Sequence, residues 1–311
     1  MSVAFLNKIL FTFYKSPPHS FTPFTQGEKE KEATLRVIEA IKPYFLSPYR
    51  LGSPSNCAEK WIRGIRYKVE RFNHGLAHGI RQGALAKDIF ELLIQMNREG
   101  ISFKETEGNK LLDWAFKKSR DPLFLKKIEL ASSFQRSGRE QEGGSSDIPE
   151  LYKKFELQDT VYFRKAAFQS GLFTDPMEIL IFQEAILWSN KGTLNEKELE
   201  DLKYLRRILH AAHTLDLRRI NGFDPVRIRN DAKEQLFGSG LDFSKDPLYK
   251  KAIDILWDRS GAYLEATGDR DVVSQRGLQN RFFLQTKNPD QMASAIDRIR
   301  KQTLNPVGSK F

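Results

Sequence analysis

Residues 57–97 read CAEKWIRGIRYKVERFNHGLAHGIRQGALAKDIFELLIQMN, and this stretch sets the fold that the sequence predicts. It is rich in Ala, Leu, Ile, Lys, Arg and Glu, a composition that favours helix. Asn56, a favourable N-cap residue, stands directly before it. The sequence therefore predicts one long helix from Cys57 to about Asn97.

Helical spacing and the positions of prolines predict further helices on both sides of this one. Proline is well tolerated at the first position of a helix, because its missing N–H has no partner there. The predicted helices cover residues 28–40, 108–119, 122–135, 159–170, 175–190, 195–220, 247–266 and 289–302. Alternating strand patterns are scarce, and no repeat of 20–50 residues is visible. We therefore expect an all-α fold.

No linker divides the chain cleanly, so we expect one globular multi-helix domain over residues 28–305. Residues 1–27 would form an N-terminal arm and residues 306–311 a C-terminal tail. The apolar start of the arm is interrupted by Lys8 and lacks the pattern of a secretory signal. We interpret it as a stripe that packs onto the domain, with a helix on a membrane surface as the alternative.

The composition narrows the class of protein. Of 311 residues, 29% are charged and 40% hydrophobic, which is typical of a folded soluble protein. Cys57 is the only cysteine, which excludes a disulfide framework and any Cys-based zinc or iron–sulfur site. A formal charge of +10 is compatible with a phosphate-rich ligand, an anionic membrane or nucleic acid. No run of 18 apolar residues exists, so we expect no transmembrane segment.

Four of the five histidines form two close pairs. His74 and His78 are four residues apart, and His210 and His213 are three apart, so each pair lies on one face of a predicted helix. Gln82 continues the first row. Histidines in a core are often structural, and His210 is the member of the pairs that best fits that role.

Glycines recur beside the first pair, at Gly75, Gly79 and Gly83. A glycine inside a helix costs about 1 kcal/mol relative to alanine. Either a neighbouring helix packs very close to this face, or a ligand approaches the backbone there.

Charged residues accompany the second pair. Asp216 stands three residues after His213, where it could orient the imidazole by hydrogen bonding, and Arg219 follows. An arginine near histidines suggests an anionic group such as phosphate. The alternative is an ordinary ion pair between Asp216 and Arg219 on a helix surface.

A polar Gly/Ser-rich loop, residues 136–149, is the third element. Arg136, Ser137, Gly138 and Arg139 could cradle a phosphate, and Glu140 could accept a ribose hydroxyl or act as acid or base. Loops rich in Arg and Glu are more often only solvated. Three kinds of site remain open from these residues: a metal site, histidine nucleophile chemistry at phosphorus, and an inert nucleotide pocket.

Three motifs in order resemble the phosphodiesterase domain of the SidE-type effectors of Legionella, including the stand-alone DupA- and DupB-like members. They are ERFNHGLAH (residues 70–78), SFQRSGRE (133–140) and HAAHTLDLRR (210–219). The resemblance spans about residues 55–285. It implies an all-helical domain that works without metal or cofactor and cleaves a pyrophosphate or phosphodiester joining ribose to ubiquitin.

The resemblance also implies roles for individual residues. His74 would be the nucleophile and His213 the general acid/base, while Glu140 would contact the ribose or tune a histidine; Glu142 is the alternative carboxylate. The substrate-binding residues would be Asn73, His78, Arg136, Arg139 and Arg219. Metal ligands are not expected.

The same resemblance implies the partners. We expect ADP-ribosylated or phosphoribosylated ubiquitin and its AMP or ADP-ribose moiety as ligands, no nucleic acid, and a monomer. The protein would be a soluble secreted effector that acts in the host cell cytoplasm. Two alternatives remain: a module that binds AMP, ADP-ribose or ubiquitin with a degenerate site, and a metal-dependent phosphohydrolase. The balance between transfer and hydrolysis is not fixed by the sequence.

Overall fold

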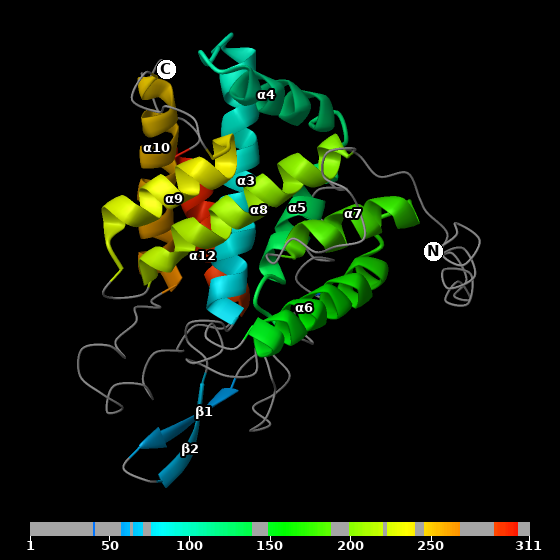
Figure 1. Ribbon diagram of the computed structural model, residues 1–311, viewed down its shortest axis with the longest axis vertical. Helices are drawn as coiled ribbons and strands as arrows, with labels where there is room; N and C mark the ends of the chain where they lie inside the picture. Colours follow the sequence, from blue (N-terminus) through cyan, green and yellow to red (C-terminus); the bar gives the residue numbers. More distant parts are fainter. Residues whose placement is uncertain are drawn as a thin grey trace.

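The computed structural model describes residues 40, 57–62, 65–70, 76–138, 149–187, 199–219, 223–239, 246–267 and 289–303. Within these ranges the protein is a bundle of helices joined to one two-stranded hairpin, which confirms the predicted all-α class (Figure 1). The helices are α3 (Leu76–Arg98), α4 (Thr106–Lys118), α5 (Phe124–Ser133), α6 (Pro149–Ser170), α7 (Pro176–Ile186), α8 (Glu200–Asp216), α9 (Pro225–Phe237), α10 (Pro247–Thr267) and α12 (Pro289–Thr303), with a 3₁₀ turn, η2 (Leu217–Arg219), after α8.

The predicted helix from Cys57 to Asn97 is wrong over its first part. Strands β1 (Cys57–Ile62) and β2 (Ile65–Glu70) pair antiparallel, with Ile62 opposite Ile65, and α3 begins only at Leu76. The reason is visible in β2, where Ile65, Tyr67 and Val69 alternate with charged residues. Branched and aromatic residues at a spacing of two favour a strand, and this pattern outweighs the helix-forming composition around it.

The prediction also differs from the structure at α9 and at the start of α6. Helix α9 was not predicted, although Asp224 caps it by accepting a hydrogen bond from the Val226 backbone N–H at 2.9 Å. Its buried stripe is narrow and its other faces are highly charged, so its apolar periodicity is weak. Helix α6 begins at Pro149, ten residues before the predicted start. Of the predicted first helix, only Ala40 is described, and it is helical and buried; the arm and the tail lie outside the described residues.

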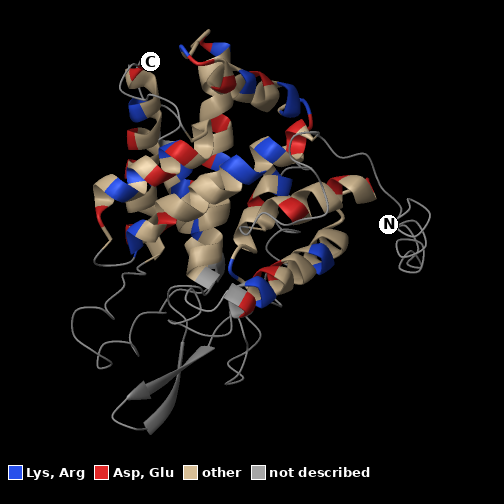
Figure 2. Cartoon of the chain, viewed as in Figure 1, with Lys and Arg blue, Asp and Glu red and all other residues tan. Residues whose placement is uncertain are grey.

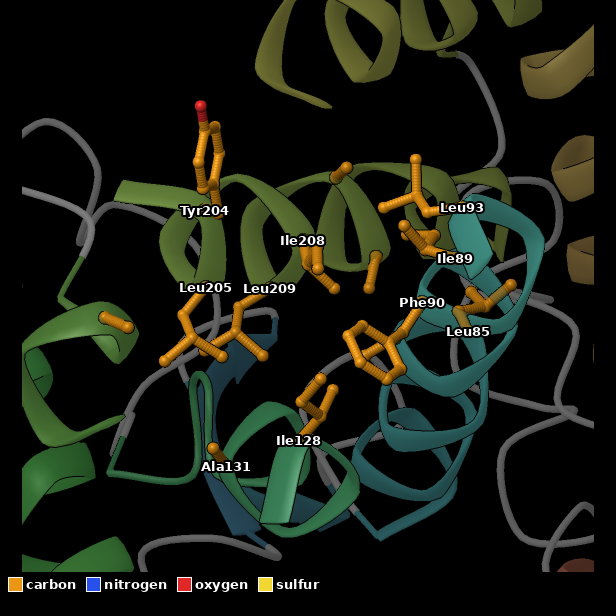
Figure 3. Close-up of a cluster of buried hydrophobic side chains, with 14 of the residues drawn as sticks. Leu85, Ile89, Phe90, Leu93, Ile128, Ala131, Tyr204, Leu205, Ile208 and Leu209 are labelled. Carbon is orange, nitrogen blue, oxygen red and sulfur yellow. The ribbon is translucent and has the colours of Figure 1, made fainter. Parts of the chain in front are cut away.

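Helix α3 is the centre of the described bundle. It contacts α5 and α8, and also α4, α10 and α12 (Figure 1). Its side chains Leu85, Ile89 and Phe90 are at most 1% exposed and meet residues of α5 and α8, including Ile128 and Ile208 (Figure 3). Burying a side chain of this size contributes about 1.5–3 kcal/mol, so this contact fixes α3 against both neighbours.

The glycine row has a packing role at Gly83. A Cβ atom there would lie 2.6 Å from Oγ of Ser133 and 2.9 Å from the carbonyl oxygen of Glu129, both on α5. Only a residue without a side chain allows α3 and α5 to approach so closely. The close-packing interpretation of this glycine is therefore the one that the structure supports.

The surface of the described helices carries both signs of charge. Basic and acidic residues both occur along α6, α8, α9 and α10 (Figure 2). No helix in the described ranges is long and apolar enough to cross a membrane.

Candidate functional site

The N-terminal half of α3 directs polar side chains into the interior. His78, Arg81 and Gln82 are three and four residues apart, so they share one helix face. Their exposed fractions are 1%, 0% and 0%. Burial of polar groups costs free energy unless they are hydrogen-bonded, so this face needs polar partners on other elements.

Asp216, the last residue of α8, provides the first of these partners. Its Oδ2 lies 2.6 Å from Nδ1 of His78, and its Oδ1 accepts a hydrogen bond of 2.7 Å from Nε of Arg81. Nη2 of Arg81 donates to Oδ2 at 3.2 Å, and Nη1 donates to the hydroxyl of Thr267 on α10 at 3.0 Å. These hydrogen bonds hold the imidazole and the guanidinium in place against the carboxylate.

Arg219 completes this group of charges. Its Nη1 donates to the backbone oxygen of Asp216 at 2.8 Å and to Oδ2 at 3.2 Å. Both side chains are about 1% exposed, so they are not a surface ion pair. The expectation that Asp216 orients His213 is also corrected, since the carboxylate binds His78, 138 residues away in the sequence.

Gln82 lies between the two histidines. Its side-chain amide meets Nδ1 of His213 and Nε2 of His78, the latter at 3.2 Å. The centroids of the two imidazole rings are 5.3 Å apart, and the rings meet edge to face. Helices α3 and α8 therefore bring together one histidine of each sequence pair, with the amide as the bridge.

His210 faces a different environment from His213. Burial lowers the pKa of His210 to about 3, and the positive charges of Arg206 and Arg136 add to this effect. A histidine that is held neutral in this way suits a structural role better than proton transfer near neutral pH.

The turn after α5 is anchored on α6 by Asp159. Oδ2 of Asp159 accepts a hydrogen bond of 2.9 Å from the backbone N–H of Arg136, and Oδ1 accepts from the hydroxyl of Ser137 and the N–H of Gly138. Arg136 has a φ of 70°, an uncommon conformation for a residue with a side chain. A Cβ atom on Gly138 would lie 2.6 Å from Cβ of Gln158, so the turn rests directly on α6.

Burial and the neighbouring hydrogen-bond donors have opposite effects on the pKa of Asp159. Burial raises the pKa of Asp159 to about 7, although the N–H groups of Gly138 and Arg136 and the Arg136 guanidinium act in the opposite direction. Nη1 of Arg136 lies 3.7 Å from Oε1 of the buried Glu156. This turn carries Arg136, one of the predicted substrate-binding residues, whose positive charge acts on His210.

Several predicted site residues are not described by the structure. Asn73, His74, Arg139, Glu140 and the alternative Glu142 lie outside the described residues. Among the described predicted residues, the structure brings His78, His213 and Arg219 together and places Arg136 near His210.

Sequence reasoning missed three polar residues of this region. Arg81 could have been found, because it follows His78 by three residues on the same helix face. Asp159 and Thr267 gave no comparable signal, since their partners lie far away in the sequence. Within the part of the chain that the structure describes, there is no group of three or more His, Cys, Asp or Glu side chains that could hold a metal ion.

Comparison with known proteins shows which family the chain matches. The family model of the SidE phosphodiesterase (PDE) domain matches residues 48–273, which include the hairpin, α3 to α10 and all three sequence motifs. No curated protein matches the chain. The fold is similar to that of a crystal structure of lpg1496 under 350 MPa, with a TM-score of 0.51 at 17% sequence identity over 96% of this chain and 97% of that chain. At this identity the similarity shows the shared fold.

Proposed function

This chain belongs to the SidE phosphodiesterase domain family, and we propose that it cleaves ADP-ribosylated or phosphoribosyl-linked ubiquitin with a histidine nucleophile and without a metal ion. The observation that carries this proposal is the buried assembly of His78, Gln82 and His213 with Asp216 and two arginines. It combines groups that transfer protons with groups that attract phosphate.

The reaction would proceed in two steps. In the first, an imidazole nitrogen of His74 attacks the phosphorus attached to the ribose of ubiquitin. A P–N bond forms, and the P–O bond to AMP, or to a substrate serine, breaks. His213 gives a proton to the departing oxygen. His74 stands four residues before His78 in the sequence and two residues before the first residue of α3.

In the second step, water attacks the phosphorus, and the P–N bond breaks. His213 takes the proton from the water, so that both histidines return to their starting states. The products are phosphoribosyl-ubiquitin together with AMP or the serine hydroxyl. A serine in place of water would give transfer instead of hydrolysis.

The other residues would stabilise charge and hold the substrate. Arg219 and Arg136 would neutralise the charge that develops on the phosphoryl oxygens, since fixed cations in a buried site act strongly on such charge. Glu140 would contact the ribose or tune a histidine, and Asn73, His78 and Arg139 would line the site. The donor set favours chemistry without metal, because two guanidinium groups already engage the Asp216 carboxylate and would repel a divalent cation.

One experiment tests this function directly. The protein is incubated with ADP-ribosylated ubiquitin and, separately, with a phosphoribosyl-serine-linked ubiquitin conjugate, and both reactions are followed by mass spectrometry with and without a strong chelator. We expect AMP or phosphoribosyl-ubiquitin to be released at a rate that the chelator does not change, and we expect the variant His74→Ala to be inactive. His19→Ala, a substitution of the same kind in the arm, is the matched control.

Three results would contradict the proposal. Full activity in His74→Ala would show that His74 is not the nucleophile. Binding of both substrates without any turnover would indicate a binding module with a degenerate site. Loss of activity with the chelator would favour the metal-dependent alternative.

A further inference from the structure

The orientation of the Gln82 amide is fixed by two backbone carbonyls. The carbonyl oxygens of Ser132 and Gln135, at the end of α5, lie 3.1 Å and 3.3 Å from one end of the amide. Carbonyl oxygens only accept hydrogen bonds, so the NH₂ group must be on their side, where it donates to both. The amide oxygen then faces Nδ1 of His213 and Nε2 of His78.

This orientation determines where His213 carries its proton. Nδ1 faces an oxygen atom that can only accept, so Nδ1 must be protonated to bond with it. In the neutral imidazole the other nitrogen, Nε2, then holds the lone pair. Proton exchange by His213 consequently takes place at Nε2.

The same orientation gives His78 a different state. Its Nε2 faces the amide oxygen at 3.2 Å, and its Nδ1 faces the Asp216 carboxylate at 2.6 Å. Both neighbours are acceptors, so both nitrogens carry protons and the ring is an imidazolium ion. The carboxylate that balances it is held by Arg81, which Thr267 holds in turn.

We propose that Gln82 is the positioning residue that assigns different protonation states to the two histidines, making His78 a permanent cation and His213 a proton carrier through Nε2. The protonation states do not depend on the proposed function, but the catalytic roles that we assign to them rest on it. His78 cannot attack phosphorus, because it has no lone pair, and its charge instead favours a bound phosphoryl group. His213 keeps one nitrogen that alternates between acid and base.

The protonation states can be measured without any turnover. Long-range ¹H–¹⁵N correlation spectra of the full chain labelled with ¹⁵N-histidine report the tautomer and charge of each ring, with His78→Gln and His213→Gln used to assign the signals. Between about pH 6 and 8, the range where an ordinary histidine titrates, we expect His78 to stay doubly protonated and neutral His213 to be protonated at Nδ1. A neutral His78, or a neutral His213 protonated at Nε2, would overturn the proposal.

A variant then connects these states to catalysis. Gln82→Met keeps the size of the side chain but removes the amide, so His213 should lose its Nδ1–H preference and kcat should fall by about tenfold or more, with KM changed less than about twofold. Gln95→Met, on the exposed side of the same helix, is the control and should behave like the unmodified protein. An unchanged His213 tautomer and unchanged kcat in Gln82→Met would refute the positioning role. If the spectra match the expectation but no substrate is turned over even by the unmodified chain, the protonation assignment stands and the proposed function fails.

Discussion

Helix α3 carries two buried polar regions, little more than one helical turn apart, and they differ in kind. The first holds His78, Arg81 and Gln82 against Asp216 and His213. The second holds Lys87, Asp88 and Glu91 against Glu129 and Arg300, and Tyr263 and Arg259 also contact Asp88. The side chains of the first region are at most 6% exposed, whereas Glu91 and Glu129 of the second are partly exposed, and only the first contains imidazoles with an amide between them.

The second region consists mainly of lysine, arginine and carboxylate side chains that form ion pairs between α3 and its neighbours, and burial lowers the pKa of Lys87 to about 8. Nε of Arg300 donates to Asp88 at 2.9 Å and its Nη2 donates to Glu91 at 2.6 Å, and these carboxylates raise the pKa of Arg300 despite its burial. The positive charges of Lys87 and Lys126 hold the pKa of Glu129 at about 2. Such pairs fasten α12 and α5 to α3. Buried ion pairs therefore occur along α3 both with and without histidines beside them, and the proposed catalytic role concerns only the region that contains the histidines.

The largest expected effect comes from breaking the first region at Asp216. Asp216→Asn places an amide next to two arginines and removes the acceptor of His78, so we expect kcat/KM to fall about 10²–10⁴-fold in protein that is still folded by circular dichroism. Asp254→Asn removes a half-exposed carboxylate that pairs with Arg229 and serves as the control. Activity within about threefold of the unmodified protein in Asp216→Asn would show that the carboxylate has no catalytic importance.

Breaking the second region should affect stability rather than activity. Arg300→Met leaves the buried Asp88 and the partly exposed Glu91 without this cation, so we expect the free energy of unfolding to fall by about 3–5 kcal/mol. The kcat/KM of the folded fraction should stay within about twofold. Arg298→Met, an exposed substitution on the same helix, should change stability by less than about 0.5 kcal/mol. Urea unfolding curves and activity assays on all three proteins check both expectations, and a large loss of kcat/KM in folded Arg300→Met would remove the distinction between the two regions.

A third group of effects should appear in the dependence of stability on pH, and these effects arise beside the first region. The pKa of Asp159 is raised in the folded protein to about 7, so its contribution to stability is complete below about pH 4 and is lost as the pH rises towards 7. The pKa of His210 is lowered to about 3, so its contribution is present above about pH 6.5 and is lost as the pH falls.

Two variants separate these opposite trends. In urea unfolding at a series of pH values, Asp159→Asn should remove the loss of stability between about pH 4 and 7, and His210→Gln should remove part of the loss on the acid side. If either variant keeps the slope of the unmodified protein, the corresponding residue does not titrate as its surroundings indicate.

The sequence predicted the helical class, and it predicted which polar residues of the candidate site share a helix face. Spacing along a helix is enough to place His78 and Gln82 on one face, and His213 close to Asp216. It could not show that Asp216 binds His78, because that contact joins α3 to the end of α8 and depends on how the helices pack. The hairpin was missed because helix-forming composition was weighted above the alternation of Ile65, Tyr67 and Val69.

Long-range partners set the remaining limit. Asp159 is in a polar stretch of α6 with no motif of its own, yet it anchors the turn that carries Arg136. Arg300 is equally inconspicuous in the sequence, and its importance comes from two carboxylates about 210 residues away. Such residues become recognisable only when the fold brings their partners to them.

The central claim is that a histidine outside the buried pair forms a covalent bond to phosphorus while His213 moves the proton. The most direct test is to mix the unmodified protein with ADP-ribosylated ubiquitin, quench the reaction at short times, and search for a phosphoribosyl-ubiquitin adduct by mass spectrometry under conditions that preserve P–N bonds. We predict an adduct on His74 that is absent when His74 is changed to Ala. Release of AMP at the unmodified rate by His74→Ala, with no adduct on any histidine, would contradict the account.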